Sequence, residues 1–224
     1  MRVDALLFDF DGVLIESEWV GARQIADWLT ANGHPTSVAQ ATALFSGHAG
    51  DEFRARVARH LGGPIPAAFD AARAIEDARV LREGVGEVAG AVAFVRSLPA
   101  DLPRAIVSSS STAWIGTHLA HLGLGDAFPH RFSGREHVAR PKPAPDLYHH
   151  AAAALGVPIE RCAIIEDSRV GATGAVASGG YVIGLTAGLH CGKGHGDALL
   201  ALGVDAVAAD FGEVARLLGL ARDV

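Results

Sequence analysis

Short apolar runs alternate along the chain with longer segments whose apolar residues recur at helical spacing. The runs lie at residues 3–8, 104–108, 162–166 and 181–185, and each is five or six residues long. Runs of this length are typical of strands that are buried on both faces of a sheet. Helical patterns at residues 146–155 and 170–178 separate the later runs. Because strands that alternate with helices build parallel sheets, the pattern predicts an α/β fold.

The segment between residues 17 and 83 breaks this alternation, since its apolar residues follow helical spacing throughout and it contains no convincing strand. Gly84 and Gly86 mark the return to the α/β pattern. We therefore expect a Rossmann-like parallel sheet core with an inserted small helical cap domain. The predicted core comprises residues 1–15 and 85–224, and the predicted cap comprises residues 16–84.

Composition and charge indicate which kinds of molecule the chain can bind. Half of the 224 residues are hydrophobic and only 20% are charged, which is typical of a compact globular chain. A net charge of -6 lacks the general attraction for nucleic acid or an anionic membrane, and no apolar run reaches the roughly 18 residues that a membrane span needs. Two cysteines argue against a disulfide framework and for a reducing compartment. We expect a soluble, cytoplasmic protein, monomer or dimer, that acts on a small molecule.

Polar residues follow the first strand where catalytic groups of parallel sheets gather, at the carboxyl ends of the strands. The run 3–8 leads directly into Asp9-Phe10-Asp11-Gly12, so two carboxylates leave one strand end two positions apart. Either aspartate alone could cap the following turn. The pair favours a shared chemical site.

Hydroxyl residues and a lysine follow the next strands. Residues 108–112 are four serines and a threonine at a predicted helix start, where an anion site and an ordinary helix cap are both expected and can coexist. After a predicted strand near residues 131–133, three prolines stiffen the loop around Lys142, one of only two lysines in the chain. A rigidly presented lysine suits charge stabilisation at a site.

The strand at residues 162–166 adds Glu166 and Asp167 to the same edge of the sheet. These adjacent acids would repel Asp9 unless a cation lay between them. Carboxylate oxygens favour a hard cation, so the sequence predicts a Mg2+ site.

The order and spacing of these groups resemble the haloacid dehalogenase superfamily over the whole chain. The matching positions are Asp9-Phe10-Asp11-Gly12-Val13-Leu14 as motif I, Ser109 as motif II, Lys142 as motif III and Glu166-Asp167 as motif IV. The segment after motif I is similar to the helical cap of the subgroup that contains beta-phosphoglucomutase and sugar-phosphate phosphatases. Just beyond motif I the chain has Glu16 where relatives commonly have aspartate.

The resemblance implies phosphoryl transfer through an aspartyl-phosphate, with Asp9 as nucleophile and Asp11 as general acid and base. It also implies that Ser109, Ser110 and Lys142 bind the phosphoryl oxygens. Mg2+ would be held by the Asp9 carboxylate, the Asp11 backbone carbonyl and Asp167, with Glu166 either a further ligand or one contact away.

Other activities of the superfamily fit less well. A dehalogenase needs neither Asp11 nor the Glu166-Asp167 pair, and a phosphonoacetaldehyde hydrolase needs a cap lysine, which residues 17–83 lack. The cap stretch at residues 45–50 carries neither the lysine nor the arginine with which a mutase grips a second phosphate. A phosphatase is therefore favoured, and a phosphosugar mutase stays the alternative. A catalytically silent binding protein is a second alternative, against which the intact motifs argue.

The cap and one late loop hold further candidates. His48 and Arg54 could contact substrate, although a solvated helix face is the simpler reading, and a sugar phosphate or a sugar-acid phosphate, such as 6-phosphogluconate, is the expected substrate class. His190, Cys191 and His195 are types that bind zinc. We expect no zinc site there, because one glycine-rich loop lacks the ordered ligand pairs of structural sites, and we expect this loop to border the active-site mouth.

Overall fold

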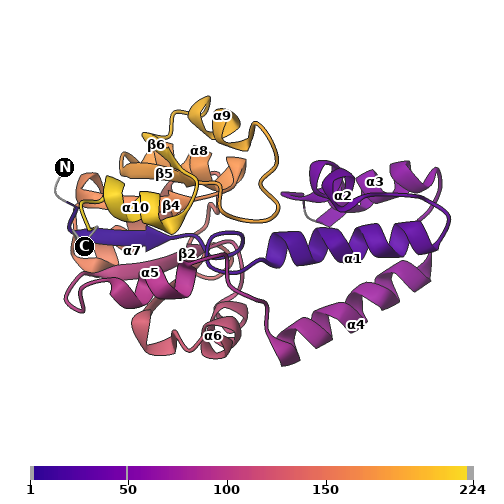
Figure 1. Cartoon of the computed structure of the whole chain (residues 1–224), viewed down its shortest axis with the longest axis horizontal. Coiled ribbons are helices and arrows are strands. Elements are labelled where there is room, and N and C mark those ends of the chain that lie inside the picture. Colours follow the sequence, from indigo (N-terminus) through magenta and orange to yellow (C-terminus); the bar gives the residue numbers. More distant parts are fainter. Residues whose placement is uncertain (1–2, 49, 221–224) are drawn as a thin grey trace.

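The computed structural model describes residues 3–48 and 50–220 and contains one six-stranded parallel sheet (Figure 1). Its strands are β1 (Ala5–Phe8), β2 (Arg104–Ser108), β3 (His130–Ser133), β4 (Cys162–Glu166), β5 (Tyr181–Leu185) and β6 (Ala206–Ala208). Their order across the sheet is β3-β2-β1-β4-β5-β6. Every pairing is parallel, so the predicted α/β fold is confirmed.

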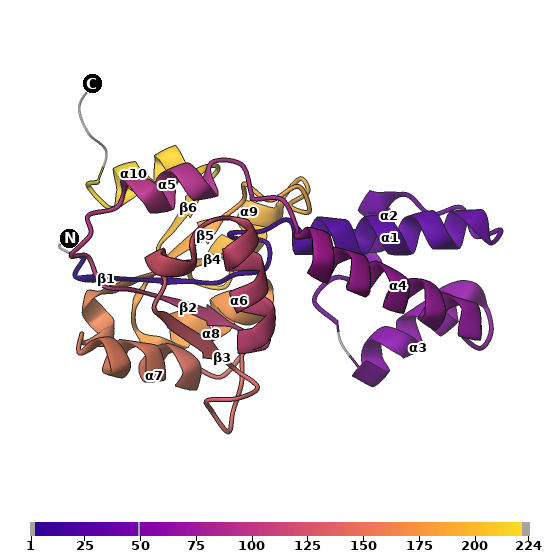
Figure 2. The ribbon, with the colours of Figure 1, turned by 90° about the horizontal axis from the view of Figure 1, so that it is seen from below.

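Helices cover both faces of the sheet (Figure 2). They are α5 (Ala91–Ser97), α6 (Thr112–His121), α7 (Asp146–Leu155), α8 (Arg169–Ser178), α9 (His195–Leu200) and α10 (Phe211–Leu217), with 3-10 turns at Gly125–Ala127 and Ile159–Arg161. Side chains of a strand alternate between faces, and in β1 Leu6 and Phe8 pack in one apolar cluster with residues of α5, α6 and α10. Ala5 and Leu7 pack in the other, with residues of α7, α8 and α9. All four β1 residues are fully buried, which explains their uninterrupted apolar run.

Residues 17–83 form a helical lobe beyond one edge of the sheet (Figures 1 and 2). Its helices are α1 (Ser17–Ala31), α2 (Val38–Phe45), α3 (Gly50–Leu61) and α4 (Ala67–Glu83). The lobe has its own apolar cluster, which includes Ile25, Leu29, Phe45 and Phe69. We propose residues 16–84 as a cap domain on this basis.

Two neighbouring stretches of chain connect the lobe to the sheet. Ile15 forms an isolated antiparallel bridge with Glu87, and the backbone N–H of Glu16 donates to the carbonyl of Gly86 at 3.0 Å. The entry and exit of the lobe are therefore held side by side. Among the described residues, no helix has both the length and the apolar character needed to cross a membrane.

Candidate active site

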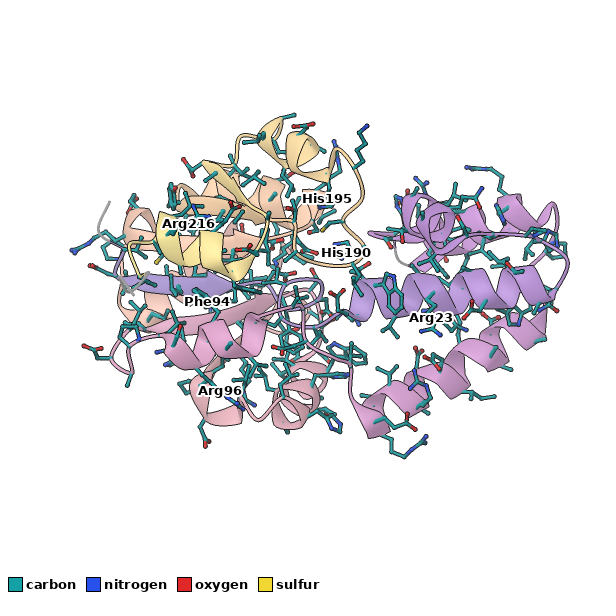
Figure 3. All side chains as sticks on the ribbon, viewed as in Figure 1. Arg23, Phe94, Arg96, His190, His195 and Arg216 are labelled. Carbon is teal, nitrogen blue, oxygen red and sulfur yellow. The ribbon has the colours of Figure 1, made fainter. Side chains whose placement is uncertain are left out.

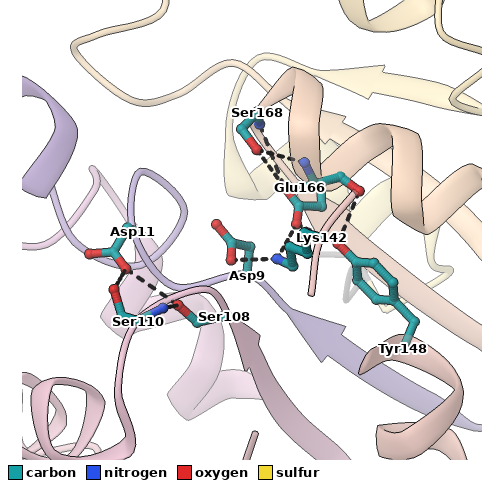
Figure 4. Close-up of polar contacts among 9 residues, drawn as sticks. Asp9, Asp11, Ser108, Ser110, Lys142, Tyr148, Glu166 and Ser168 are labelled. Carbon is teal, nitrogen blue, oxygen red and sulfur yellow. Dashed lines mark hydrogen bonds and ion pairs between the residues drawn. The ribbon is translucent and has the colours of Figure 1, made fainter. Parts of the chain in front are cut away.

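The predicted site residues lie at the carboxyl ends of β1, β2 and β4, on the edge of the sheet that faces the helical lobe (Figures 1 and 4). Asp9 directly follows β1, and Glu166 ends β4. Adjacent parallel pairing brings these strand ends together, since Phe8 is in register with Ile165. The sheet order thus accounts for the meeting of residues that are more than 150 positions apart in sequence.

Lys142 links the two acidic strand ends. Its Nζ atom lies 2.7 Å from Asp9 Oδ1 and 2.5 Å from Glu166 Oε1, and its side chain is only 3% exposed (Figure 4). Glu166 also accepts hydrogen bonds from Tyr148 Oη at 2.7 Å and from Ser168 Oγ at 3.3 Å. Both oxygens of Glu166 therefore already have donors, whereas Asp9 Oδ2 accepts no hydrogen bond from the described residues.

Asp167 lies beside this group without such partners. Neither of its carboxylate oxygens, both buried, has a hydrogen-bond partner in the described part of the chain. His190 Nε2 is 2.8 Å from Asp167 Oδ2. The two groups are close, but their orientation does not make a hydrogen bond, so both carboxylate oxygens of Asp167 lack a hydrogen-bond donor among the described residues. Carboxylate oxygens of Asp9, Glu166 and Asp167 all lie within 4.8 Å of one another.

One ammonium group cannot balance three buried carboxylates. Burial and the charge of Glu166 raise the pKa of Asp9 well above its usual value, although Lys142 opposes that shift. Burial, Glu166 and Glu18 raise the pKa of Asp167 in the same way. An oxygen-only donor set, with unpaired oxygens and excess negative charge, fits a hard divalent cation such as Mg2+.

Gly12 allows the chain to pass close to this group. Its φ is +80°, and a Cβ atom at this position would lie 2.0 Å from Asp167 Oδ2. Any other residue would need both the left-handed backbone conformation and the space that the carboxylate occupies. The glycine of motif I is therefore required by the position of Asp167.

Asp11 has different surroundings from Asp9 and points away from it in Figure 4. Ser17 Oγ and Trp114 Nε1 donate to Asp11 Oδ1 at 2.7 and 3.1 Å. Ser110 Oγ donates to Oδ2 at 2.6 Å, and Ser108 Oγ lies 3.4 Å from the same atom. Neutral donors from the start of α1, from β2 and the loop after it, and from α6 thus hold this carboxylate.

The hydroxyl residues after β2 divide between several tasks. Ser108 and Ser110 contact Asp11, and Ser111 caps α6 by accepting from the backbone N–H of Trp114. Ser109 is exposed, and its hydroxyl makes no hydrogen bond with the described residues. Its side chain is therefore available to a ligand in this conformation.

The two candidate cap residues are paired within the helical lobe. His48 Nδ1 lies 3.0 Å from Glu52 Oε1, and Arg54 Nη1 lies 2.7 Å from Asp70 Oδ1. No contact joins either residue to Asp9 within the described residues. Their predicted role in substrate binding stays a prediction.

Several side chains at the site were not singled out from the sequence. Tyr148 donates a hydrogen bond to Glu166, and Trp114 donates one to Asp11. In the sequence, each is marked only by its position in the first turn of a helix that follows a candidate residue. Glu18, on the first turn of α1, is a further acid at the site, where burial and Asp11 raise its pKa. Glu16, which stands where relatives commonly have aspartate, accepts a hydrogen bond from the backbone N–H of Leu189 at 3.0 Å. This residue therefore joins the entrance of the lobe to the loop after β5.

The expectation that this loop borders the site agrees with the geometry. His190 lies on it and His195 begins α9, which follows it; of the two, His190 is nearer to α1 (Figure 3). His190 reaches both Asp167 and Gly12.

Comparison with known proteins places the chain in a family. The profile of haloacid dehalogenase-like hydrolases matches residues 3–179. Hexitol phosphatase A of Escherichia coli is 32% identical over 189 residues, which cover 84% of this chain and 85% of the relative. The 6-phosphogluconate phosphatase of the same organism is 29% identical, with the same coverage of both chains.

A solved structure agrees over the full length. The crystal structure of a haloacid dehalogenase family hydrolase from Deinococcus radiodurans, with bound phosphate and sodium, superposes with a TM-score of 0.86 at 32% identity, covering 100% of this chain and 99% of that one. The predicted superfamily, fold and enzyme class are confirmed by these matches. With its four motif segments gathered at one sheet edge, the chain belongs to the haloacid dehalogenase-like hydrolases.

Proposed function

We propose that this chain is a Mg2+-dependent phosphatase that hydrolyses a small phosphorylated sugar or sugar acid through a phosphorylated Asp9. The observation that carries the proposal is the buried pairing of Asp9 with Lys142 beside the unpaired carboxylate of Asp167. A dianionic phosphoryl group needs a nucleophile among positive charges, and this arrangement supplies one. Phosphatases among the relatives support the reaction type.

Asp9 is the nucleophile. Lys142 occupies Oδ1, and Oδ2 has no donor among the described residues, so Oδ2 is the atom that attacks phosphorus. The bond from phosphorus to the leaving oxygen breaks as the bond to Oδ2 forms. The product of this first step is an acyl phosphate on Asp9 and an alcohol.

Asp11 moves the protons. It gives a proton to the leaving oxygen in the first step and takes one from the attacking water in the second, which releases inorganic phosphate and restores Asp9. In the conformation described, its carboxylate is bound by Ser17, Ser110 and Trp114. To reach the leaving oxygen, Asp11 exchanges one of these contacts for the substrate.

Lys142 and Ser109 bind the phosphoryl oxygens, and Ser110 adds a hydroxyl when it leaves Asp11. Asp9, the backbone carbonyl of Asp11 and Asp167 would hold Mg2+. Glu166 instead orients Lys142, because Lys142, Tyr148 and Ser168 occupy its oxygens. The metal, when bound, neutralises charge on the phosphoryl group and on the acids around it.

The helical lobe limits the substrate. It stands over the edge of the sheet that carries Asp9, and chain segments that cover a site exclude water and large substrates. Small phosphorylated sugars therefore fit better than phosphoproteins. The cations Arg54 and Arg56 are paired with Asp70 and Glu52, so neither is free in this conformation to grip a second phosphate as a mutase needs.

Phosphate release from a panel of compounds tests the proposal. The purified chain with Mg2+ is incubated with hexitol phosphates, hexose phosphates, 6-phosphogluconate and a phosphopeptide, with the Asp9→Asn variant as control. We expect free phosphate from the small compounds only, and none from the variant. Isomerised sugar phosphate without phosphate release would identify a mutase, and equal release by Asp9→Asn would rule out the phosphorylated aspartate.

A further inference from the structure

The loop after β5 and the first residue of α9 bring together three side chains of types that bind borderline metal ions. A ring nitrogen of His190, the Sγ atom of Cys191 and a ring nitrogen of His195 all lie within 4.8 Å of one another. The sequence predicts no zinc site here because the residues share one glycine-rich segment. The folded loop nevertheless brings their donor atoms to one point.

We propose that His190, Cys191 and His195 form a second metal site, for Zn2+ or a similar borderline divalent ion, next to the Asp9 and Asp167 carboxylates. His190 Nε2 and Cys191 Sγ are 3.4 Å apart. Two ligands in a tetrahedral zinc site, with bonds of about 2.0–2.3 Å, are separated by roughly 3.6 Å. The pair therefore already has the spacing of neighbouring zinc ligands.

Buried atoms around the loop supply an independent argument. His190 Nδ1 is buried without a partner among the described residues, so the polar contacts of the ring all lie on its Nε2 side. On that side Asp167 Oδ2, also without a hydrogen-bond partner, is 2.8 Å away. An oxygen donor thus lies beside His190 Nε2, and zinc takes carboxylate oxygen as well as nitrogen and sulfur ligands.

The surroundings hold both histidines in place. His195 Nε2 donates to the backbone carbonyl of Asp167, which leaves the lone pair of this ring on Nδ1. Metal-bound histidines are commonly oriented in this way by a carbonyl on the other nitrogen. His190 packs against Gly12, where a Cβ atom would come within 2.9 Å of its ring.

Binding at this site would oppose Mg2+. The ion would displace the Cys191 thiol proton to water and would then lie against Asp167, which the proposed function assigns to Mg2+. The two cations would then share the negative charge of one carboxylate, so each would weaken the attraction of the other to Asp167. We therefore infer that Zn2+ inhibits the enzyme; this consequence rests on the proposed function, whereas binding itself does not.

Cobalt absorption tests the binding. Co2+ replaces Zn2+ in such sites, and a Co2+–thiolate bond gives a strong near-ultraviolet charge-transfer band. With reductant present, we expect one such band per chain that one equivalent of Zn2+ removes. The chain has only two cysteines, so the band can be assigned with two variants.

Cys191→Ser should lose the band, and Cys162→Ala should keep it, because Cys162 is buried in β4 away from the loop. His195→Ala should weaken Zn2+ binding by more than about tenfold, since even supporting contacts to metal ligands are worth 10- to 100-fold. Absence of the band, or its persistence in Cys191→Ser, would overturn the proposal. So would Zn2+ affinity that is unchanged in both loop variants.

Inhibition is then measured at fixed Mg2+. We expect micromolar Zn2+ to slow phosphate release by the original chain and to need at least about tenfold higher concentration for Cys191→Ser. Equal inhibition of the two would overturn the inhibitory role. If no phosphorylated compound is hydrolysed at all, the proposed function fails, while the cobalt band still decides on the metal site.

Discussion

Asp9 and Asp11 are two positions apart but have neighbours of different charge. Asp9 lies against the ammonium group of Lys142, while the donors to Asp11, among them Ser110 and Trp114, are neutral. A carboxylate held by an ammonium can bear a phosphoryl group without adding uncompensated charge. One held by exchangeable neutral donors is free to gain and lose a proton. This difference supports the separate roles that we propose for two chemically identical side chains.

The two aspartates should therefore respond differently to the same substitution. Asp9→Asn should abolish phosphate release, because no acyl phosphate can form. Asp11→Asn should retain the nucleophile and lower kcat by about 10^2- to 10^4-fold through loss of proton transfer. Phosphate release with an alkyl phosphate measures both, and comparable residual rates for the two variants would contradict the assignment.

Tyr148 contributes to stability through Glu166. Tyr148→Phe removes the donor at 2.7 Å from Glu166 Oε1, which leaves a fully buried carboxylate short of one partner. We expect the free energy of unfolding to fall by about 1–3 kcal/mol in urea denaturation. Tyr181→Phe, the other tyrosine, is the control and should be nearly neutral; a similar loss in both would show that the hydroxyl contact is not the cause.

Asp167 should destabilise the chain when no metal is bound. Its buried charge faces Asp9 and Glu166, so Asp167→Asn relieves repulsion in the metal-free protein. A gain of about 1–2 kcal/mol corresponds to a rise in Tm of roughly 2–8 °C. The increase in Tm that Mg2+ gives the original chain should disappear in the variant.

Differential scanning fluorimetry with chelator and with Mg2+ compares the two conditions. Asp27→Asn, at a side chain that is 70% exposed, is the control and should keep both Tm values. A lower metal-free Tm for Asp167→Asn, together with an intact Mg2+ response, would place the cation elsewhere.

At the scale of elements, the start of α8 fits against the end of β4. A Cβ atom on Gly171 would lie 2.1 Å from the Glu166 carboxylate, so the helix can approach the strand end only because the side chain is missing. Gly21, in α1, would place a Cβ atom with nothing within 4 Å. Both glycines lie in helices, so helix propensity alone predicts the same effect of an alanine substitution at either position. Their different packing predicts different effects.

The two glycine substitutions should have opposite signs. Gly21→Ala should raise the free energy of unfolding by about 0.5–1 kcal/mol, as expected for alanine in an open helix position. Gly171→Ala should lower both stability and kcat, because Glu166 has to move and takes Lys142 with it. Denaturation and phosphate release measure the pair, and stabilisation by Gly171→Ala would contradict the packing argument.

Element prediction from the sequence succeeded where burial was complete. The apolar runs that become β1, β2, β4 and β5 are buried almost throughout, and the helix 146–155 matches α7 at both ends. β6 was missed because it has three residues at the edge of the sheet, two of them only half-buried, and its apolar run, residues 206–209, is shorter than the runs of the predicted strands.

The sequence predicted which residues meet at the site, but it did not predict which side chains contact one another there. Strand ends placed Asp9, Lys142 and Asp167 together, because the edge of a parallel sheet is fixed by topology. The turning of Asp11 toward Trp114 depends on side-chain rotation and on the direction of α6, neither of which has a sequence signature. The convergence of His190 and His195 depends on an irregular loop, whose path the hydrophobic pattern does not report.

At the scale of the whole molecule, the entrance of the helical lobe is tied to a segment near the other end of the chain. Glu16, at the lobe entrance, is 8% exposed and accepts from the backbone N–H of Leu189 in the loop after β5. This bond joins the first connection of the lobe to a segment 173 positions later in the chain. Glu16 thus links the entrance of the lobe directly to that loop.

Glu16→Ala should release the loop without unfolding the sheet. Loss of a hydrogen bond to a carboxylate costs about 1.5–3 kcal/mol, so amide hydrogen exchange at Leu189 should become about 10- to 100-fold faster. Exchange in β1 and β4 should not change and provides the internal control. Unchanged exchange at Leu189 would mean that other contacts hold the loop.

The position of β1 has a consequence for how the enzyme is made. β1 is the first strand in the sequence but a central one in the sheet, and its partners are residues 104–106 of β2 and 162–165 of β4. During synthesis, more than 150 residues have to follow Asp9 before all of its neighbours exist, whereas the helices of residues 17–83 can form from local contacts. Any product of premature termination before β4 therefore lacks Glu166 and Asp167 as well as one side of the nucleophile's strand. Such a fragment can neither close the sheet nor hydrolyse a metabolite, so activity appears only in chains whose sheet is complete.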